Sequence, residues 1–120
     1  MKKNRVNKSE EISLRINLGT RPIFGHGKAK LLHAISINGS ISAAARNIGM
    51  SYRRAWLLTN AMNKDFKLPL TESFLGGKGG GGAVLTKEGL KVLKLFRSME
   101  KKAQNSLIDE KMFFTKLINK

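Results

Sequence analysis

The sequence predicts a mainly α-helical protein with a small β component: a winged helix-turn-helix with an N-terminal strand or hairpin and a long C-terminal helix. Two short segments with helical spacing of their apolar residues follow each other, separated by Gly49. A loop of seven residues, six of them glycine (76–82), then lies between two short apolar segments typical of a hairpin. The chain has 120 residues, which suits one domain and not two.

The N-terminal part is predicted to form a tail and a hairpin. Residues 1–11 are mostly polar and charged, and we expect a flexible basic N-terminus there. Apolar and polar residues alternate from Ile12 to Leu18, which predicts a half-buried strand. After a turn at residues 19–21, residues 22–24 can return as a short edge strand.

Three helices are predicted next. The first covers residues 28–38 and ends before Gly39, and the second is a short alanine-rich helix with Ser42 as N-cap and Gly49 as its end. The third covers residues 52–63, with Ser51 as N-cap. The apolar positions that we expect in the core of the first and third helices are Leu31, Leu32, Ile35, Ala55, Leu58, Thr59 and Met62.

The last part is predicted to hold a hairpin and one long helix. Pro69 ends any helix before it, and residues 70–75 and 83–85 are expected to be the two strands. Thr86 is the expected N-cap of a helix over residues 87–105, and residues 107–118 form a further helix or extension. We therefore assign residues 12–105 to the winged helix-turn-helix and residues 106–120 to a C-terminal helical extension.

The charge points to a polyanionic partner. Lys and Arg number 23 against 8 Asp and Glu, and no acidic residue occurs from Ile12 to Lys64. Such an excess favours nucleic acid or an anionic membrane surface. The absence of cysteine excludes disulfides and thiolate metal sites and is consistent with the cytoplasm, where we place the protein. No apolar run is long enough to span a bilayer, and we expect no membrane association.

Two helices joined by a glycine turn can read DNA when small side chains on the first helix let the two pack closely. The second helix then presents its outer side chains to the DNA. Ala45 and Gly49 are four residues apart, as this packing requires, and Ser40 and Ser42 stand at the start of the supporting helix. Arginine can pair with guanine and asparagine with adenine. The candidate recognition residues are Ser51, Tyr52, Arg53, Arg54, Trp56 and Asn60.

Some alternatives stay open at this level. The same pattern occurs in an ordinary helical hairpin with two surface arginines. Trp56 either packs beneath the hairpin loop or contacts a sugar or a thymine methyl group, and Leu57 has the same two interpretations.

The glycine loop is interpreted as the wing, a hairpin tip with one cation that suits the DNA backbone or minor groove. Gly77, Gly79 and Gly82 match G-x-G-x-x-G in form, but a strand is expected after them where a dinucleotide site needs a helix. A flexible linker is the alternative. The wing residues are Gly76, Gly77, Lys78, Gly79, Gly80, Gly81 and Gly82.

No catalytic constellation is apparent. His26 lies between two glycines, and His33 lies inside a predicted helix, where we expect a half-buried structural residue. The acidic residues have no metal-ligand spacing relative to them. We therefore expect no enzyme activity, no metal and no cofactor.

Several segments taken together carry a resemblance to a known family: GSISAAA (39–45), MSYRRAW (50–56), AMN (61–63), GGKGGGGA (76–83) with Leu85, Thr86 and Gly89, and FGHGKAKLLHAI (24–35). These segments resemble the DNA-binding domain of the ModE family of molybdate-responsive transcriptional regulators. The resemblance runs from about Leu14 to Glu100. It implies a LysR-like winged helix-turn-helix that binds a palindromic operator as a homodimer. It also implies the recognition role for Ser51, Tyr52, Arg53, Arg54 and Trp56, and the wing role for residues 76–82.

Two departures qualify what the resemblance implies. Family members continue into molybdate-binding modules, whereas this sequence stops at Lys120, so we expect a stand-alone form and no molybdate binding from this chain alone. His26 stands where the family often has proline. We conclude that the sequence predicts a sequence-specific regulator that binds double-stranded DNA. The alternatives are a non-specific basic nucleoid- or RNA-binding protein and an interaction module that works through its C-terminal helices.

Overall fold

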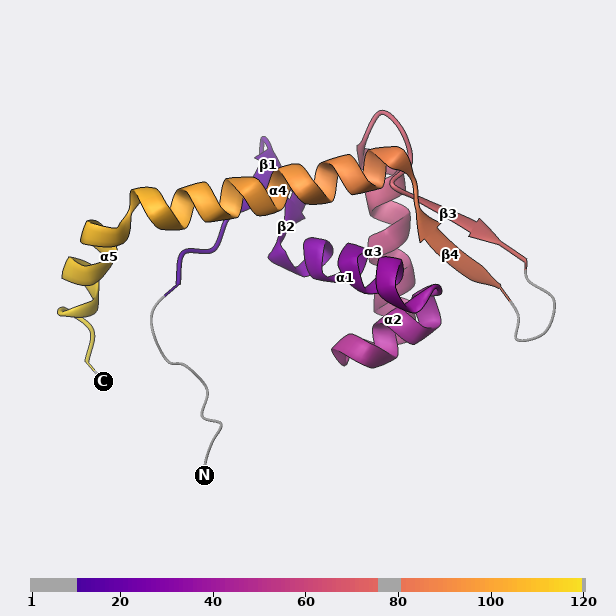
Figure 1. The fold of residues 1–120 in the computed structure, drawn as a ribbon, viewed down its shortest axis with the longest axis horizontal. Helices are drawn as coiled ribbons and strands as arrows, with labels where there is room; N and C mark the ends of the chain where they lie inside the picture. The colour runs from indigo at the N-terminus through magenta and orange to yellow at the C-terminus, as the bar shows by residue number, and fades with distance from the viewer. Residues whose placement is uncertain (1–10, 76–80, 120) are drawn as a thin grey trace, which may run out of the picture.

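The computed structural model describes residues 11–75 and 81–119. It confirms a mainly α-helical winged helix-turn-helix with two small antiparallel hairpins. Helices α1, α2 and α3 lie beneath one half of the long helix α4, the second hairpin extends from the same end, and α5 turns away at the other end (Figure 1). The elements in order are β1 (Arg15–Leu18), β2 (Arg21–Gly25), α1 (His26–Asn38), α2 (Ile41–Ile48), α3 (Tyr52–Asp65), β3 (Thr71–Phe74), β4 (Gly82–Leu85), α4 (Lys87–Ser106) and α5 (Ile108–Thr115).

The core is built around α1. Leu31, Leu32 and Ile35 are fully buried, as their spacing predicts. Phe24, at the end of the first hairpin, packs edge-on against Phe96 of α4 with ring centroids 5.0 Å apart. The other core residues come from α1, α2 and α3, from the residue just before β3, and from β4: Ala29, Ala34, Ala44, Ala45, Ala55, Met62, Leu70 and Ala83. The core therefore fixes α3 and the second hairpin to one scaffold.

One predicted helix start is wrong. Ser40, and not Ser42, is the N-cap of α2, because the Ser40 hydroxyl oxygen accepts a hydrogen bond from the backbone N–H of Ala43 at 3.0 Å. Ser42 lies inside the first turn and is exposed. Gly39 immediately before the cap has a φ of 78°, so the chain reverses within two residues and the helix begins earlier than its alanines suggest.

The two serines give a direct test of this cap. Replacing Ser40 by alanine is expected to lower the free energy of unfolding by about 1 kcal/mol, since the N–H of Ala43 loses its acceptor. Replacing Ser42 by alanine should leave it unchanged or raise it slightly, because alanine favours the helix interior. Urea unfolding of both variants measures the difference. An equal loss in the two variants would contradict the observed cap.

The first hairpin is shorter and less buried than predicted. Strand β1 starts at Arg15 rather than Ile12, and all four of its residues are exposed. The ladder with β2 is irregular between Ile16 and Asn17; Phe24 is the fully buried residue of the hairpin, and the half-buried Ile23 packs against the core. The alternation from Ile12 to Leu18 therefore does not mark a half-buried strand within one copy of the chain.

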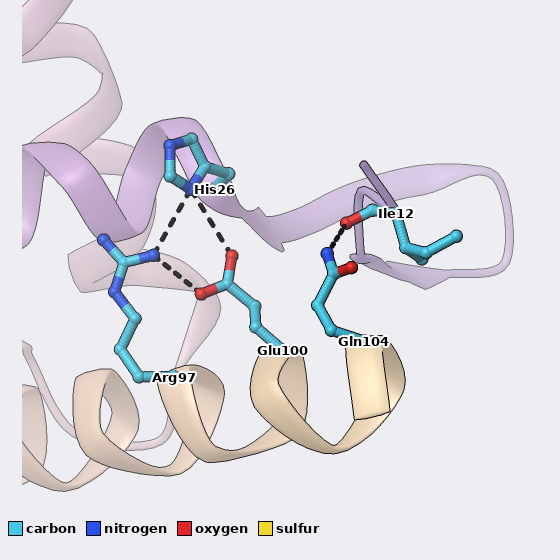
Figure 2. A network of polar contacts seen from close by, with 5 residues as sticks. All are labelled: Ile12, His26, Arg97, Glu100 and Gln104. Carbon is cyan, nitrogen blue, oxygen red and sulfur yellow. Dashed lines mark hydrogen bonds and ion pairs between the residues drawn. The ribbon is translucent and has the colours of Figure 1, made fainter. Parts of the chain in front are cut away.

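A polar cluster joins the start of α1 to α4 (Figure 2). Glu100 accepts a hydrogen bond from Arg97 at 2.7 Å, and the His26 ring nitrogen lies 3.4 Å from the same carboxylate. One turn further on, the Gln104 side chain donates to the backbone oxygen of Ile12 at 2.7 Å, which ties the N-terminal segment to α4 (Figure 2). His26 thus begins α1, two residues before the predicted start of that helix at residue 28.

The second histidine is also placed differently from the prediction. His33 is exposed on α1 and is not a half-buried structural residue. The core-facing positions of α1 are its neighbours Leu32 and Ala34, which leaves the His33 side chain pointing to solvent.

Candidate nucleic-acid interface

The turn between α2 and α3 has the geometry of a helix-turn-helix. Gly49 ends α2 with a φ of 71°, a backbone conformation that side chains disfavour. The N–H of Met50 then donates to the Ala45 carbonyl at 2.9 Å, which closes the turn. Ser51 caps α3 by accepting from the N–H of Arg54 at 3.1 Å, as predicted. Ala45 is buried at the helix contact, so the predicted spacing of Ala45 and Gly49 is realised.

Helix α3 has one buried face and one outward face. Ala55, Thr59 and Met62 are buried in the core, as the sequence predicts. The opposite face carries residues at successive turns, at positions i, i+4, i+7 and i+11. These four residues, which we call the outward face, are Arg53, Leu57, Asn60 and Lys64. Lys64 was not among the predicted site residues, although its spacing of eleven residues from Arg53 would have shown it.

A groove separates α3 from the second hairpin. It has a volume of about 660 Å³ and is lined by Tyr52 and Trp56 on one side and by Phe74 and Gly82 on the other. Ser40, Ser42 and Arg46 of the supporting helix close its end. Trp56 is 45% exposed, so its side chain stands in this groove and is not buried beneath the hairpin.

Arg53 and Arg54 face different surroundings. Arg54 lines a second groove, on the other side of α3, together with Arg15 and Lys28 from the first hairpin and α1. Arg53 belongs to the outward face between the two grooves. Together, Arg54, Arg15 and Lys28 make this flank of α3 basic.

The second hairpin is held against the helices at its base. Its strands pair from Thr71 opposite Leu85 to Phe74 opposite Gly82. The N–H of Ala83 donates to the carbonyl of Gly39 at 2.8 Å, which links β4 to the end of α1. A Cβ on Gly82 would lie 2.6 Å from the ring of the exposed Phe74, which would have to move to admit a side chain there. The predicted wing residues Gly76, Gly77, Lys78, Gly79 and Gly80 lie outside the described residues.

Sequence reasoning missed the residue that connects α3 to this hairpin. The Asn63 side-chain oxygen accepts from the backbone N–H groups of Leu70 at 2.8 Å and Thr71 at 3.0 Å. Its amide nitrogen donates to the Thr71 hydroxyl at 3.0 Å. The local sequence holds no signal for these bonds, since the partners come seven and eight residues later, after Pro69.

Three cations of α3 make no ion pair within the described residues. Within residues 11–75 and 81–119, the ion pairs are Arg21 with Asp65, and His26 and Arg97 with Glu100. Arg53, Arg54 and Lys64 make none of these pairs.

The described part of the chain, residues 11–75 and 81–119, holds no group of three His, Cys, Asp or Glu side chains that could bind a metal ion. None of its helices combines the length and apolarity that crossing a membrane requires.

Comparisons with known proteins agree with this architecture. No protein-family model matches the chain. The "DNA-binding transcriptional dual regulator ModE" of Escherichia coli K12 is 38% identical over 103 residues, which is 83% of this chain and 39% of that protein. The "Transcriptional regulator ModE" of Haemophilus influenzae is 37% identical over 99 residues, 82% of this chain and 39% of that protein. The "Molybdenum-pterin-binding protein MopB" of Rhodobacter capsulatus is 46% identical over 76 residues, 63% of this chain and 28% of that protein.

The chain spans about two fifths of the length of the ModE relatives that it matches. The matched part includes most of this chain, and the chain has the helix-turn-helix and hairpin geometry described above. On this similarity, the chain belongs to the ModE family.

Proposed function

We propose that the chain is a sequence-specific transcriptional regulator that binds double-stranded DNA and has no catalytic activity. The observation that carries this proposal is the outward face of α3, where Arg53, Asn60 and Lys64 stand at successive turns between two grooves. The relatives named as transcriptional regulators support it. An α-helix of this kind fits the major groove, where base pairs expose distinct donors and acceptors.

The proposed roles follow from position. Helix α3 enters the major groove with Ser51, Tyr52, Arg53, Arg54, Trp56 and Asn60, while Ser40, Ser42, Ala45 and Gly49 belong to the supporting helix and turn. The Ser51 oxygen accepts the capping bond, so its hydroxyl hydrogen is left to donate to a phosphate. The wing, residues 76–82, contacts the backbone or minor groove. Arg54, beside Arg15 and Lys28, binds backbone phosphates, and Arg53 reads a base.

Selection of bound sequences from random DNA tests the proposal. A single preferred site, bound at least about a thousandfold more tightly than unrelated DNA, is expected of a specific regulator. Arg53→Glu should abolish binding to this site, whereas Lys94→Glu, the same reversal on exposed α4, should reduce it much less. Equal binding of all sequences would favour the alternative, a non-specific nucleoid- or RNA-binding protein.

The proposal predicts a steep dependence on salt. A dimer that neutralises roughly 6–10 phosphates should show log K falling against log salt with a slope of about −5 to −9. Filter binding from low to moderate potassium chloride measures this slope. Arg54→Ala should make the slope less negative by about one per chain, since a phosphate contact is lost. A slope near zero for the parent protein would exclude an electrostatic contact with the backbone.

We further propose a homodimer that binds a palindromic operator. Helices α4 and α5 expose a series of large apolar side chains that no other element covers within the described residues: Leu90, Leu95, Ile108, Met112, Phe113, Phe114 and Leu117. Exposed apolar side chains on these helices suit a self-complementary contact. We propose residues 12–105 as the DNA-binding unit and residues 106–120 as an extension that contributes to the dimer.

The dimer is testable in solution. Sedimentation equilibrium at tens of micromolar should give twice the chain mass, and Phe113→Glu combined with Phe114→Glu should give the monomer. The control is a double variant at two exposed lysines of α4, Lys101→Glu with Lys102→Glu, and it should stay dimeric. A monomeric parent protein at this concentration would contradict the proposal.

Molybdate is not part of the proposed activity of these 120 residues. Tight binding of a tetrahedral oxyanion takes a rigid set of N–H groups, hydroxyls and cations, and we propose that these residues alone do not supply one. Equilibrium dialysis with molybdate, with sulfate as control, checks this expectation. Molybdate-specific binding at micromolar concentration would contradict it.

A further inference from the structure

Leu57 is an apolar side chain in the middle of a polar, cationic face. It is 49% exposed and lies one turn after Arg53 and one turn before Asn60 on the outward face of α3. Leu57 lines a shallow groove with Arg21, Lys28, Asn60 and Lys64, and with Asp65, whose carboxylate pairs with Arg21. The other apolar residues of that groove are Pro22 and Ala61. An exposed leucine so placed is available to a partner from outside the described residues.

The surroundings of Leu57 indicate what that partner is. A second copy of the chain is disfavoured, because a symmetric contact through this face would bring Arg53 and Lys64 against themselves. A polyanion that exposes a small apolar group at the bottom of a groove complements the charge and the apolar side chain of the face around Leu57. In the major groove of DNA that apolar group is the 5-methyl of thymine.

We propose that Leu57 is a specificity-determining residue that contacts the 5-methyl group of one thymine in each half-site. The inference rests on the proposed function, because it requires α3 to lie in the major groove. Arg53 and Asn60, one turn to either side, read bases next to this thymine. The leucine selects thymine over cytosine by its methyl group alone, with no hydrogen bond.

Deoxyuridine tests this contact, because it differs from thymidine only by the methyl group. In the sequence selected by the parent protein, each thymine is replaced singly by uracil. At one position in each half-site the parent should lose about fourfold in affinity, the value of one buried methyl group. Leu57→Ala should bind thymine and uracil equally at that position. Leu57→Met, which keeps an apolar contact, should retain a preference for thymine.

A matched control separates this contact from a general effect of removing a leucine. Leu68 is exposed to a similar degree but follows α3, in the loop before β3. Leu68→Ala should keep the full thymine preference. Thermal unfolding of each variant verifies that the fold is intact.

The outcomes separate the inference from the proposed function. If the parent selects a site but no thymine-to-uracil change weakens its binding, the inference is wrong and the proposed function stands. If Leu57→Ala keeps the parent's preference for thymine, the inference is wrong as well. If no site is selected at all, the proposed function fails and the inference fails with it.

Discussion

Alanine at position 89 is expected to lower the free energy of unfolding by at least about 3 kcal/mol. Gly89 lies in the first turn of α4, where its N–H donates to the cap oxygen of Thr86 at 3.0 Å. A Cβ there would lie 2.1 Å from the carbonyl oxygen of Leu70. That carbonyl cannot withdraw freely, since it accepts from the N–H of Thr86 at 3.0 Å. The added methyl group must therefore break the contact between the second hairpin and α4.

Urea unfolding of the Gly89→Ala variant measures this loss, and Gly27→Ala is the matched control. Gly27 lies in the first turn of α1, and a Cβ there meets nothing within 4 Å. Alanine at position 27 should leave stability unchanged or raise it by up to about 1 kcal/mol. Equal midpoints for Gly89→Ala and the parent protein would show that α4 and Leu70 are not in close contact.

Asn63→Ala is expected to lower both the free energy of unfolding and the affinity for DNA. The change leaves the N–H groups of Leu70 and Thr71 without acceptors, and both residues are buried. Each unsatisfied group costs about 1–3 kcal/mol, so the sum is a large part of the stability of a small domain. Because these bonds join α3 to β3, the wing should also lose its fixed direction relative to the recognition helix.

Two variants and two measurements distinguish these effects. Asn63→Asp keeps the acceptor oxygen, and the Thr71 hydroxyl can donate to it, so its loss of stability should be smaller. Asn60→Ala, three residues earlier on the outward face, should weaken specific DNA binding without lowering the unfolding temperature. Thermal unfolding reports the first effect, and hydroxyl-radical footprinting at the wing contacts reports the second. A variant Asn63→Ala that unfolds at the parent's temperature would contradict the structural role.

The fold was largely predictable because its signals are local. Helical spacing at Leu31, Leu32 and Ile35 and the glycines at positions 39 and 49 identified the helices and their ends. The error at Ser40 and Ser42 arose because either serine can cap the same alanines. Which of the two does so depends on the tight turn at Gly39.

What the sequence could not show depends on residues that are distant in the chain. Strand β1 is exposed, and the half-buried residues of the alternation, Ile12 and Leu14, lie before it, so the alternating pattern misled the prediction of a strand. Arg53 and Arg54 are adjacent in sequence but turn to different flanks of α3, which only the packing of Ala55, Thr59 and Met62 determines. The hydrogen bonds of Asn63 form only because the backbone after Pro69 folds back against α3. The spacing of apolar residues in the sequence does not indicate this contact.

The twenty residues of α4 extend about 30 Å. In the proposed dimer, the two chains are joined through the C-terminal part of α4 and through α5. Helix α4 is then a rigid spacer that sets the distance between the two DNA-binding units. One helical turn is about 5.4 Å and one base-pair step about 3.4 Å, so removing a turn would move each unit by between one and two steps. The spacing of the half-sites would then be encoded in the number of turns in α4, in residues that never touch the DNA.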